Sequence, residues 1–179
     1  MKMKKIITVL LLSCTLFCLS QHQKGDITIS ISASPLTTET NSDIGIIGKA
    51  GLEVFLSEKF SFGGSFFISD NTVLKNESGT PINSYGLIPS IHYYFINQPK
   101  INVFGQLGYG YGVQNTKNIN GGSDDDALTI FSIGVGLNYR LNDKLQLQLL
   151  LPYFDAQNIT KDETAADGVA IFLGFNFKL

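Results

Sequence analysis

Few side chains in this sequence could take part in chemistry, and they fall on the polar faces of four predicted strands. They are Lys49, Glu53, His92, Arg140 and Lys178. A histidine near a carboxylate can transfer protons, so the set could form a gate or a proton-linked site. Buried charges also need partners simply to be tolerated. We favour the second interpretation, a structural plug of paired charges and amides.

Ser90 lies two residues before His92 on the same predicted face, and a Ser–His pair is the minimum for nucleophilic catalysis. The other histidine, His22, is expected in an unfolded start of the mature chain. A serine near a histidine is common by chance, and no further feature marks a nucleophile. The sequence therefore predicts no catalytic, cofactor-binding or metal-binding residue, and no cofactor.

The densest charge run is Asp124-Asp125-Asp126, which follows Gly121-Gly122. Oxygen-rich loops can bind Ca²⁺, but this spacing is not that of a calcium loop. Alternate residues would also point apart if the run were extended. We expect a solvated loop.

Eight segments alternate apolar and polar residues with the period of two that indicates β-strands. They span 26–34, 44–56, 60–69, 84–95, 101–114, 127–140, 145–154 and 168–179. Each is close to the ~9–11 residues that a tilted strand needs to cross a bilayer. The connections alternate long and short, which is typical of an antiparallel outer-membrane barrel with short periplasmic turns and long outer loops. The predicted fold is therefore all-β, an eight-stranded antiparallel transmembrane β-barrel with an up-and-down meander.

The content of the two faces distinguishes this barrel from a soluble sandwich or lipocalin-like barrel. The polar face carries Ser, Thr, Gly, Gln and Asn with few charges, which suits a narrow lumen better than a surface in water. The other face is apolar, with aromatic residues toward the strand ends, as expected at membrane surfaces. Larger side chains are also predicted to point inward and fill the lumen, namely Phe55, Phe67, Tyr94, Phe104, Leu150, Phe154 and Phe172. We therefore expect little or no ion conduction.

Residues 1–20 have the pattern of a secretory signal peptide. Lys2, Lys4 and Lys5 precede an apolar run that continues to Leu19, and cleavage is expected before Gln21. A membrane anchor and lipidation at Cys14 are the alternatives. The domain prediction is a cleaved signal over 1–20 and an outer-membrane barrel over 21–179, which places the protein in the bacterial outer membrane.

Charge excludes one class of partner. Without the three lysines of the predicted signal, 10 basic residues stand against 15 acidic ones, a net charge of -5. Nucleic-acid binding needs a basic surface, so no nucleic-acid partner is expected. The four long loops hold eleven acids and three lysines, a net charge of -8. Such a rim favours cationic partners, or divalent ions that bridge to lipopolysaccharide phosphates.

Two stretches carry a family resemblance: Tyr85-Gly-Leu-Ile-Pro-Ser-Ile-His-Tyr-Tyr-Phe95 and Phe104-Gly-Gln-Leu-Gly-Tyr-Gly-Tyr-Gly112. With the strand pattern around them, the chain resembles the small outer-membrane β-barrel domain family, OmpA-like or OmpX-like, of Bacteroidota type. Its end, with Phe175, Phe177 and Leu179 at period two, resembles the signal read by the barrel-assembly machinery, although it ends on Leu where an aromatic residue is usual.

The resemblance implies a non-enzymatic protein with a structural or surface-binding role in adhesion or membrane integrity, acting through its acidic outer loops. Outer-membrane lipids, lipopolysaccharide, the assembly machinery and a surface ligand at the loops are the implied partners. A lipid A-modifying enzyme and a narrow porin-like channel are the alternatives.

Overall fold

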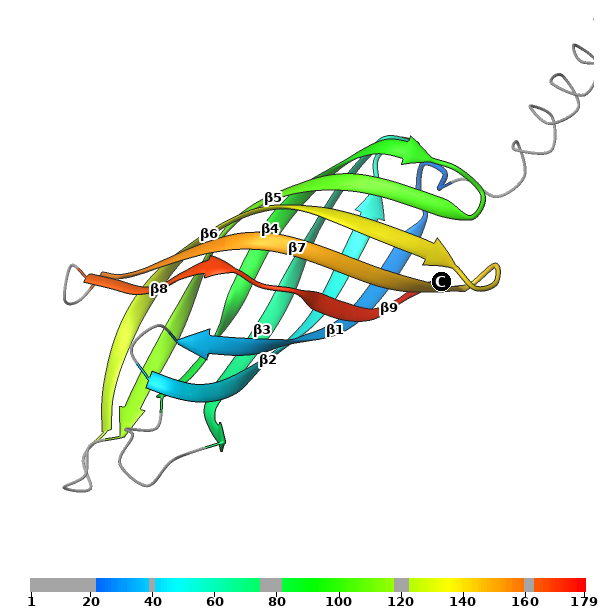
Figure 1. The fold of residues 1–179 in the computed structure, drawn as a ribbon. Helices are drawn as coiled ribbons and strands as arrows, with labels where there is room; N and C mark the ends of the chain where they lie inside the picture. Colours follow the sequence, from blue (N-terminus) through cyan, green and yellow to red (C-terminus); the bar gives the residue numbers. More distant parts are fainter. Residues whose placement is uncertain (1–21, 39–40, 75–81, 118–122, 160–162) are drawn as a thin grey trace, which may run out of the picture.

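The computed structural model describes residues 22–38, 41–74, 82–117, 123–159 and 163–179, which form an antiparallel β-barrel (Figure 1). The strands are β1 (Ile27–Thr38), β2 (Asn41–Phe55), β3 (Phe60–Leu74), β4 (Ile82–Asn97), β5 (Ile101–Lys117), β6 (Ser123–Arg140), β7 (Leu145–Asn158), β8 (Glu163–Val169) and β9 (Phe172–Lys178). No helix in these ranges is both long enough and apolar enough to cross a membrane.

The barrel closes because β1 pairs with β9 while β7 pairs with both β8 and β9. The pairs Tyr153↔Val169 and Leu150↔Phe172 keep one register along β7. Thus β8 and β9 are two parts of one strand, and the barrel has eight strands in meander order. The predicted fold class is confirmed.

The prediction of one continuous terminal strand over 168–179 is wrong, because this strand is interrupted between β8 and β9. The interruption lies opposite Pro152, which has no N–H to donate to a neighbouring strand. Instead, the N–H of Ala170 donates to the Pro152 carbonyl at 3.0 Å, and the N–H of Ile171 donates to Ser34 Oγ at 3.2 Å. Gly168, with φ of 137°, lies just before the interruption.

Most strands are longer than predicted. β5 and β6 continue to the pair Lys117↔Ser123, so residues assigned to a loop continue the hairpin. Strands extend in this way because backbone hydrogen bonding between neighbours continues beyond the apolar stretch. The predicted short turns are confirmed, and Figure 1 shows them at the end of the barrel that holds the C-terminus. This end is termed the short-turn end and the opposite one the hairpin end.

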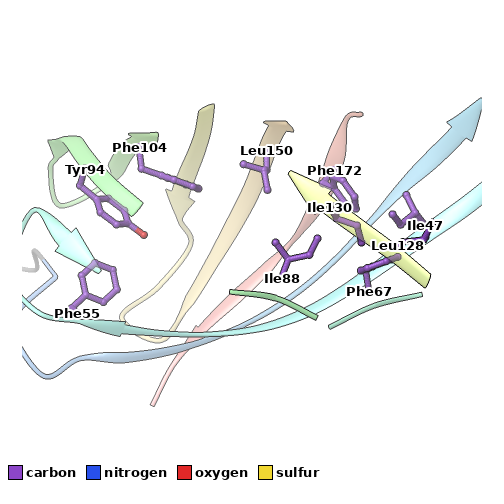
Figure 2. Close-up of a cluster of buried hydrophobic side chains, with 10 residues drawn as sticks. All are labelled: Ile47, Phe55, Phe67, Ile88, Tyr94, Phe104, Leu128, Ile130, Leu150 and Phe172. Carbon is purple, nitrogen blue, oxygen red and sulfur yellow. The ribbon is translucent and has the colours of Figure 1, made fainter. Parts of the chain in front are cut away.

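The predicted faces are confirmed. Outward aromatic residues are exposed as a membrane requires, among them Tyr85, Tyr93, Phe95, Tyr109, Tyr111, Tyr139 and Tyr153. The interior contains buried apolar residues from strands β2 to β7 and β9, namely Ile47, Phe55, Phe67, Ile88, Tyr94, Phe104, Leu128, Ile130, Leu150 and Phe172. In Figure 2, Phe55, Tyr94 and Phe104 lie at one end of this cluster. The predicted inward residue Phe154 is half-buried and packs against this cluster.

Gly136 makes room for one of these rings. A Cβ at this position would lie less than 3.0 Å from three atoms of the Phe104 ring, closer than real Cβ contacts. The ring therefore lies directly over the backbone of β6 and fills the lumen where a side chain would otherwise stand.

Candidate functional site

The carboxylate of Glu53 is the centre of a polar network inside the barrel. Its Oε1 accepts hydrogen bonds from Ser61 Oγ and from the Tyr94 hydroxyl, the latter at 2.7 Å. His92 Nδ1 lies 3.4 Å from the same oxygen. Both side chains are largely enclosed, with 11% of His92 and 14% of Glu53 exposed. Hydrogen bonds and a nearby imidazole are what a buried carboxylate requires.

Three neighbouring strands bring this network together. In the β2–β3 register Phe55 lies opposite Ser61, and in the β3–β4 register Ser61 lies opposite His92. Glu53 lies two residues before Phe55 in β2, and Tyr94 lies two residues after His92 in β4, both on the inward face. The sequence placed Glu53 and His92 on one face, but Ser61 and Tyr94 were missed as partners. The sequence pattern places Ser61 and Tyr94 on that face, but it does not give the stagger between strands that brings them to Glu53.

The network does not have the geometry of a catalytic triad. In a triad, the two ring nitrogens of the histidine separately contact the nucleophile and the carboxylate. Here Ser61 Oγ lies 3.4 Å from His92 Nδ1, the nitrogen that also faces Glu53, and Ser61 donates directly to the carboxylate. Ser61 is also fully buried. The arrangement stabilises a buried charge and presents no accessible nucleophile.

Lys49 lies further toward the hairpin end of β2 and is 7% exposed. Its Nζ lies 5.0 Å from the ring centre of Phe172 and 5.6 Å from that of Phe154, so two aromatic faces partly stabilise the charge. It takes part in no ion pair among the side chains that the structure describes. The expectation that every lumen charge is paired is therefore wrong for Lys49. Ring faces substitute for a carboxylate at this position.

A small cavity of about 40 Å³ separates Lys49 from the Glu53 network. Its other polar lining includes Ser32, Ser90, Gln106 and Gln148. A site needs roughly 10–15 Å³ of such volume to hold one water molecule, so this space has room for a few waters or one small polar group.

Three ring side chains, His22, Phe55 and Tyr94, close the short-turn end of the lumen. These three residues are termed the cork. The imidazole stacks on Phe55, with ring centres 4.0 Å apart and planes at 8°, and contacts Tyr94 at 5.5 Å. His22 is 1% exposed, so the expectation that it lies in an unfolded start is wrong. Gly25, with φ of 91°, allows the turn before β1 that directs the chain back over the mouth.

His22 is held in its neutral form. Burial, and then the positive charge of Arg140, lower the pKa of His22 from 6.5 to about 4. Gln146 Nε2 lies 3.4 Å from His22 Nε2, where only a neutral ring nitrogen can accept a hydrogen bond. Beside the mouth, Lys178 Nζ pairs with Asp26 Oδ2 at 2.6 Å. Lys178 therefore belongs to the closed end, as the plug interpretation expects.

The acidic run lies in a strand. Asp124, Asp125 and Asp126 begin β6 and pair with Thr116, Asn115 and Gln114 of β5. Asp126 is buried, whereas Asp124 and Asp125 are both exposed. Within the described ranges, no group of three His, Cys, Asp or Glu side chains could hold a metal ion. The loop assignment is thus corrected to a hairpin.

Comparison with known proteins agrees with this architecture. Residues 10–177 match the family model described as outer membrane protein beta-barrel domain. A sequence search of the curated proteins finds no match.

Solved structures share the fold at low sequence identity. Ail, the attachment invasion locus protein of Yersinia pestis, has a TM-score of 0.60 at 15% identity, covering 88% of this chain and 100% of its own. Neisserial surface protein A has a TM-score of 0.64 at 10% identity, with 88% and 97% covered. OprG of Pseudomonas aeruginosa has a TM-score of 0.57 at 13% identity, with 89% and 98% covered. From the match over nearly its whole length, the chain belongs to the outer membrane protein beta-barrel domain family and is located in the bacterial outer membrane.

Proposed function

We propose that this protein is a non-enzymatic outer-membrane barrel that binds ligands at the cell surface through its acidic hairpins. The observation that supports this most is the closed interior. The cork fills the mouth at the short-turn end, and Tyr94 continues into Phe104 at a ring distance of 5.2 Å. Glu53 and His92 take part in the buried network, and Lys49 is buried against two aromatic rings, so the accessible polar surface lies at the ends of the strands.

The hairpin of β5 and β6 is the best-defined part of that surface. Asn115 Nδ2 donates to Asp125 Oδ1 at 2.5 Å, which fixes the two strands against each other above the apolar belt. The exposed carboxylates of Asp124 and Asp125 lie beside this bond. Rigid, exposed negative charge attracts cationic partners, including basic proteins and divalent ions bound to lipopolysaccharide. We also propose that the barrel-assembly machinery recognises the outward-facing Phe175 and Phe177 of β9.

The test is an exchange of residues 115–126 for a neutral Gly/Ser hairpin of equal length. Intact cells carrying the native or exchanged protein are compared for adhesion to polylysine and to basic matrix proteins at several salt concentrations. We expect the exchange to remove most of the adhesion that depends on the native protein, and salt to weaken the remainder. Unchanged adhesion after the exchange, with equal surface expression, would refute the surface-binding proposal.

Two measurements separate the alternatives. Lipid A from a deletion strain should be unchanged by mass spectrometry, whereas a lost acyl chain restored by the wild type but not by His92→Ala would indicate an enzyme. In planar bilayers the purified protein should give no steady conductance, because aromatic rings fill the eight-stranded lumen. Reproducible single-channel steps altered by Glu53→Gln would indicate a narrow channel.

A further inference from the structure

Among the residues that the structure describes, one stretch of the barrel wall is not joined by backbone hydrogen bonds. The β1–β9 register ends at Ala33↔Leu173, although β1 continues beside β2 as far as Thr38. Across the gap, β8 pairs with β7 alone among the described strands. Figure 1 shows β8 and the end of β1 diverging toward the hairpin end. This opening between residues 34–38 of β1 and β8 is termed the seam.

The sequence itself favours the seam. Pro35 lies in β1 just beyond the last residue paired with β9, and Pro152 lies opposite the interruption between β8 and β9. Proline cannot donate a ladder hydrogen bond, so within sheets it is confined to edges, strand starts and bulges. Two prolines therefore flank the point where pairing stops.

Lys49 lies at the base of the seam. It is opposite Ser32 of β1, which is in turn opposite Gly174 of β9, one row below the last β1–β9 pair. The aromatic rings nearest its ammonium belong to Phe154 of β7 and Phe172, the first residue of β9. A buried ammonium with no carboxylate partner among the described residues is unfavourable, and an anionic ligand would relieve that cost.

The surroundings of Lys49 are polar on one side and apolar on the other. The cavity of about 40 Å³ beside it has room for a group the size of a carboxylate. Toward the hairpin end, the interior is lined by buried Ile47, Phe67, Leu128 and Ile130. Glu53 also lines the cavity, but its carboxylate already accepts hydrogen bonds from Ser61 and Tyr94.

We propose that the seam admits a single-chain amphiphile with a terminal carboxylate, of the fatty-acid class. Its carboxylate pairs with Lys49 in the cavity, and its chain passes between β1 and β8 into the surrounding lipid. The cork closes the short-turn end, so the ligand exchanges only with the membrane leaflet on the side of the hairpin end. This site is independent of the surface-binding function.

The test uses palmitic acid carrying a diazirine in mid-chain, added to the purified full-length protein in phosphatidylcholine vesicles. After illumination, cross-links are located by mass spectrometry. In the wild type we expect them to concentrate on β1 and β8 beside the seam, and on Phe172 and Leu173 at its base. For Lys49→Met we expect the cross-linking yield to fall on the order of tenfold, because the charge-assisted contact is lost. Lys49→Arg should keep most of the labelling.

The matched control is a diazirine alcohol of the same chain length, which should label the wild type no better than the acid labels Lys49→Met. Equal yields for acid and alcohol, or for the wild type and Lys49→Met, would overturn the proposal, as would labels spread evenly around the lipid-facing surface.

A second variant keeps the test valid if Lys49→Met does not fold. Continuing the β1–β9 register places Pro35 opposite Ile171, and both side chains are exposed. In the double variant Pro35→Cys/Ile171→Cys, oxidation should close the base of the seam and lower labelling several-fold, and reduction should restore it. Labelling that does not respond to the redox state of a formed disulfide would refute entry through the seam.

Discussion

Gly136→Ala should destabilise the barrel although it adds only one methyl group. The new Cβ would meet the flat face of Phe104, whose ring is 1% exposed. That ring cannot move sideways, because the ring centre of Tyr94 lies 5.2 Å away and that of His92 lies 5.5 Å away. Overpacking of this kind costs about 1–3 kcal/mol. Glycine is also a weak strand former, so a less crowded alanine would be neutral or slightly stabilising.

Gly64→Ala is the matched control. Its Cβ would find its nearest neighbour at 3.6 Å, an ordinary contact. The free energy of unfolding is measured by urea titration of protein refolded in vesicles, with the heat-modifiable shift in electrophoretic mobility as the readout of folding. We expect a loss for Gly136→Ala and a change within about 0.5 kcal/mol for the control.

A double-mutant cycle completes the experiment. Phe104→Leu removes the ring face, so Gly136→Ala should cost much less in that background, with a coupling of about 1–2 kcal/mol. The same cost in both backgrounds would show that Phe104 does not lie on Gly136. Equal behaviour of Gly136→Ala and Gly64→Ala would refute the packing argument altogether.

Three further predictions follow from the mouth, the outer face and the topology. Because the pKa of His22 is 6.5 in the unfolded chain and about 4 in the folded one, the free energy of unfolding should decrease as pH falls from 6.5 to 4, by about 3 kcal/mol in full. In urea titrations His22→Phe should flatten this dependence on pH, and an unchanged dependence would mean that His22 is not buried. Phe175→Asp puts a charge on the lipid face and should lower the assembled fraction in outer-membrane extracts, whereas Phe175→Leu should not; equal assembly would contradict the assigned face. A cysteine at Asn118 should react with an impermeant maleimide on intact cells while one at Lys144 should not, and the reverse pattern would invert the predicted orientation.

The sequence by itself determined the architecture and the two faces of its wall. Side-chain direction in a strand alternates with every residue, so Phe104 and Leu107 fall on opposite faces whatever the rest of the chain does. A shift of one residue would have exchanged the faces, and the chemistry of the residues removed that ambiguity. This is why the inward rings, the outward tyrosines, the strand number and the membrane location could all be predicted.

Only the tertiary structure decided which inward groups meet. The stagger between neighbouring strands joins Glu53 to Ser61 and Tyr94, and no local pattern encodes that stagger. His22 lies in a segment with no strand pattern, and its burial depends on the width of a mouth formed by distant strands. The seam arises where β1 meets the last strand, and so does the burial of Lys49, which has no carboxylate partner among the described residues. Such contacts join residues far apart in the sequence, so they are fixed by closure of the barrel and not by any single stretch.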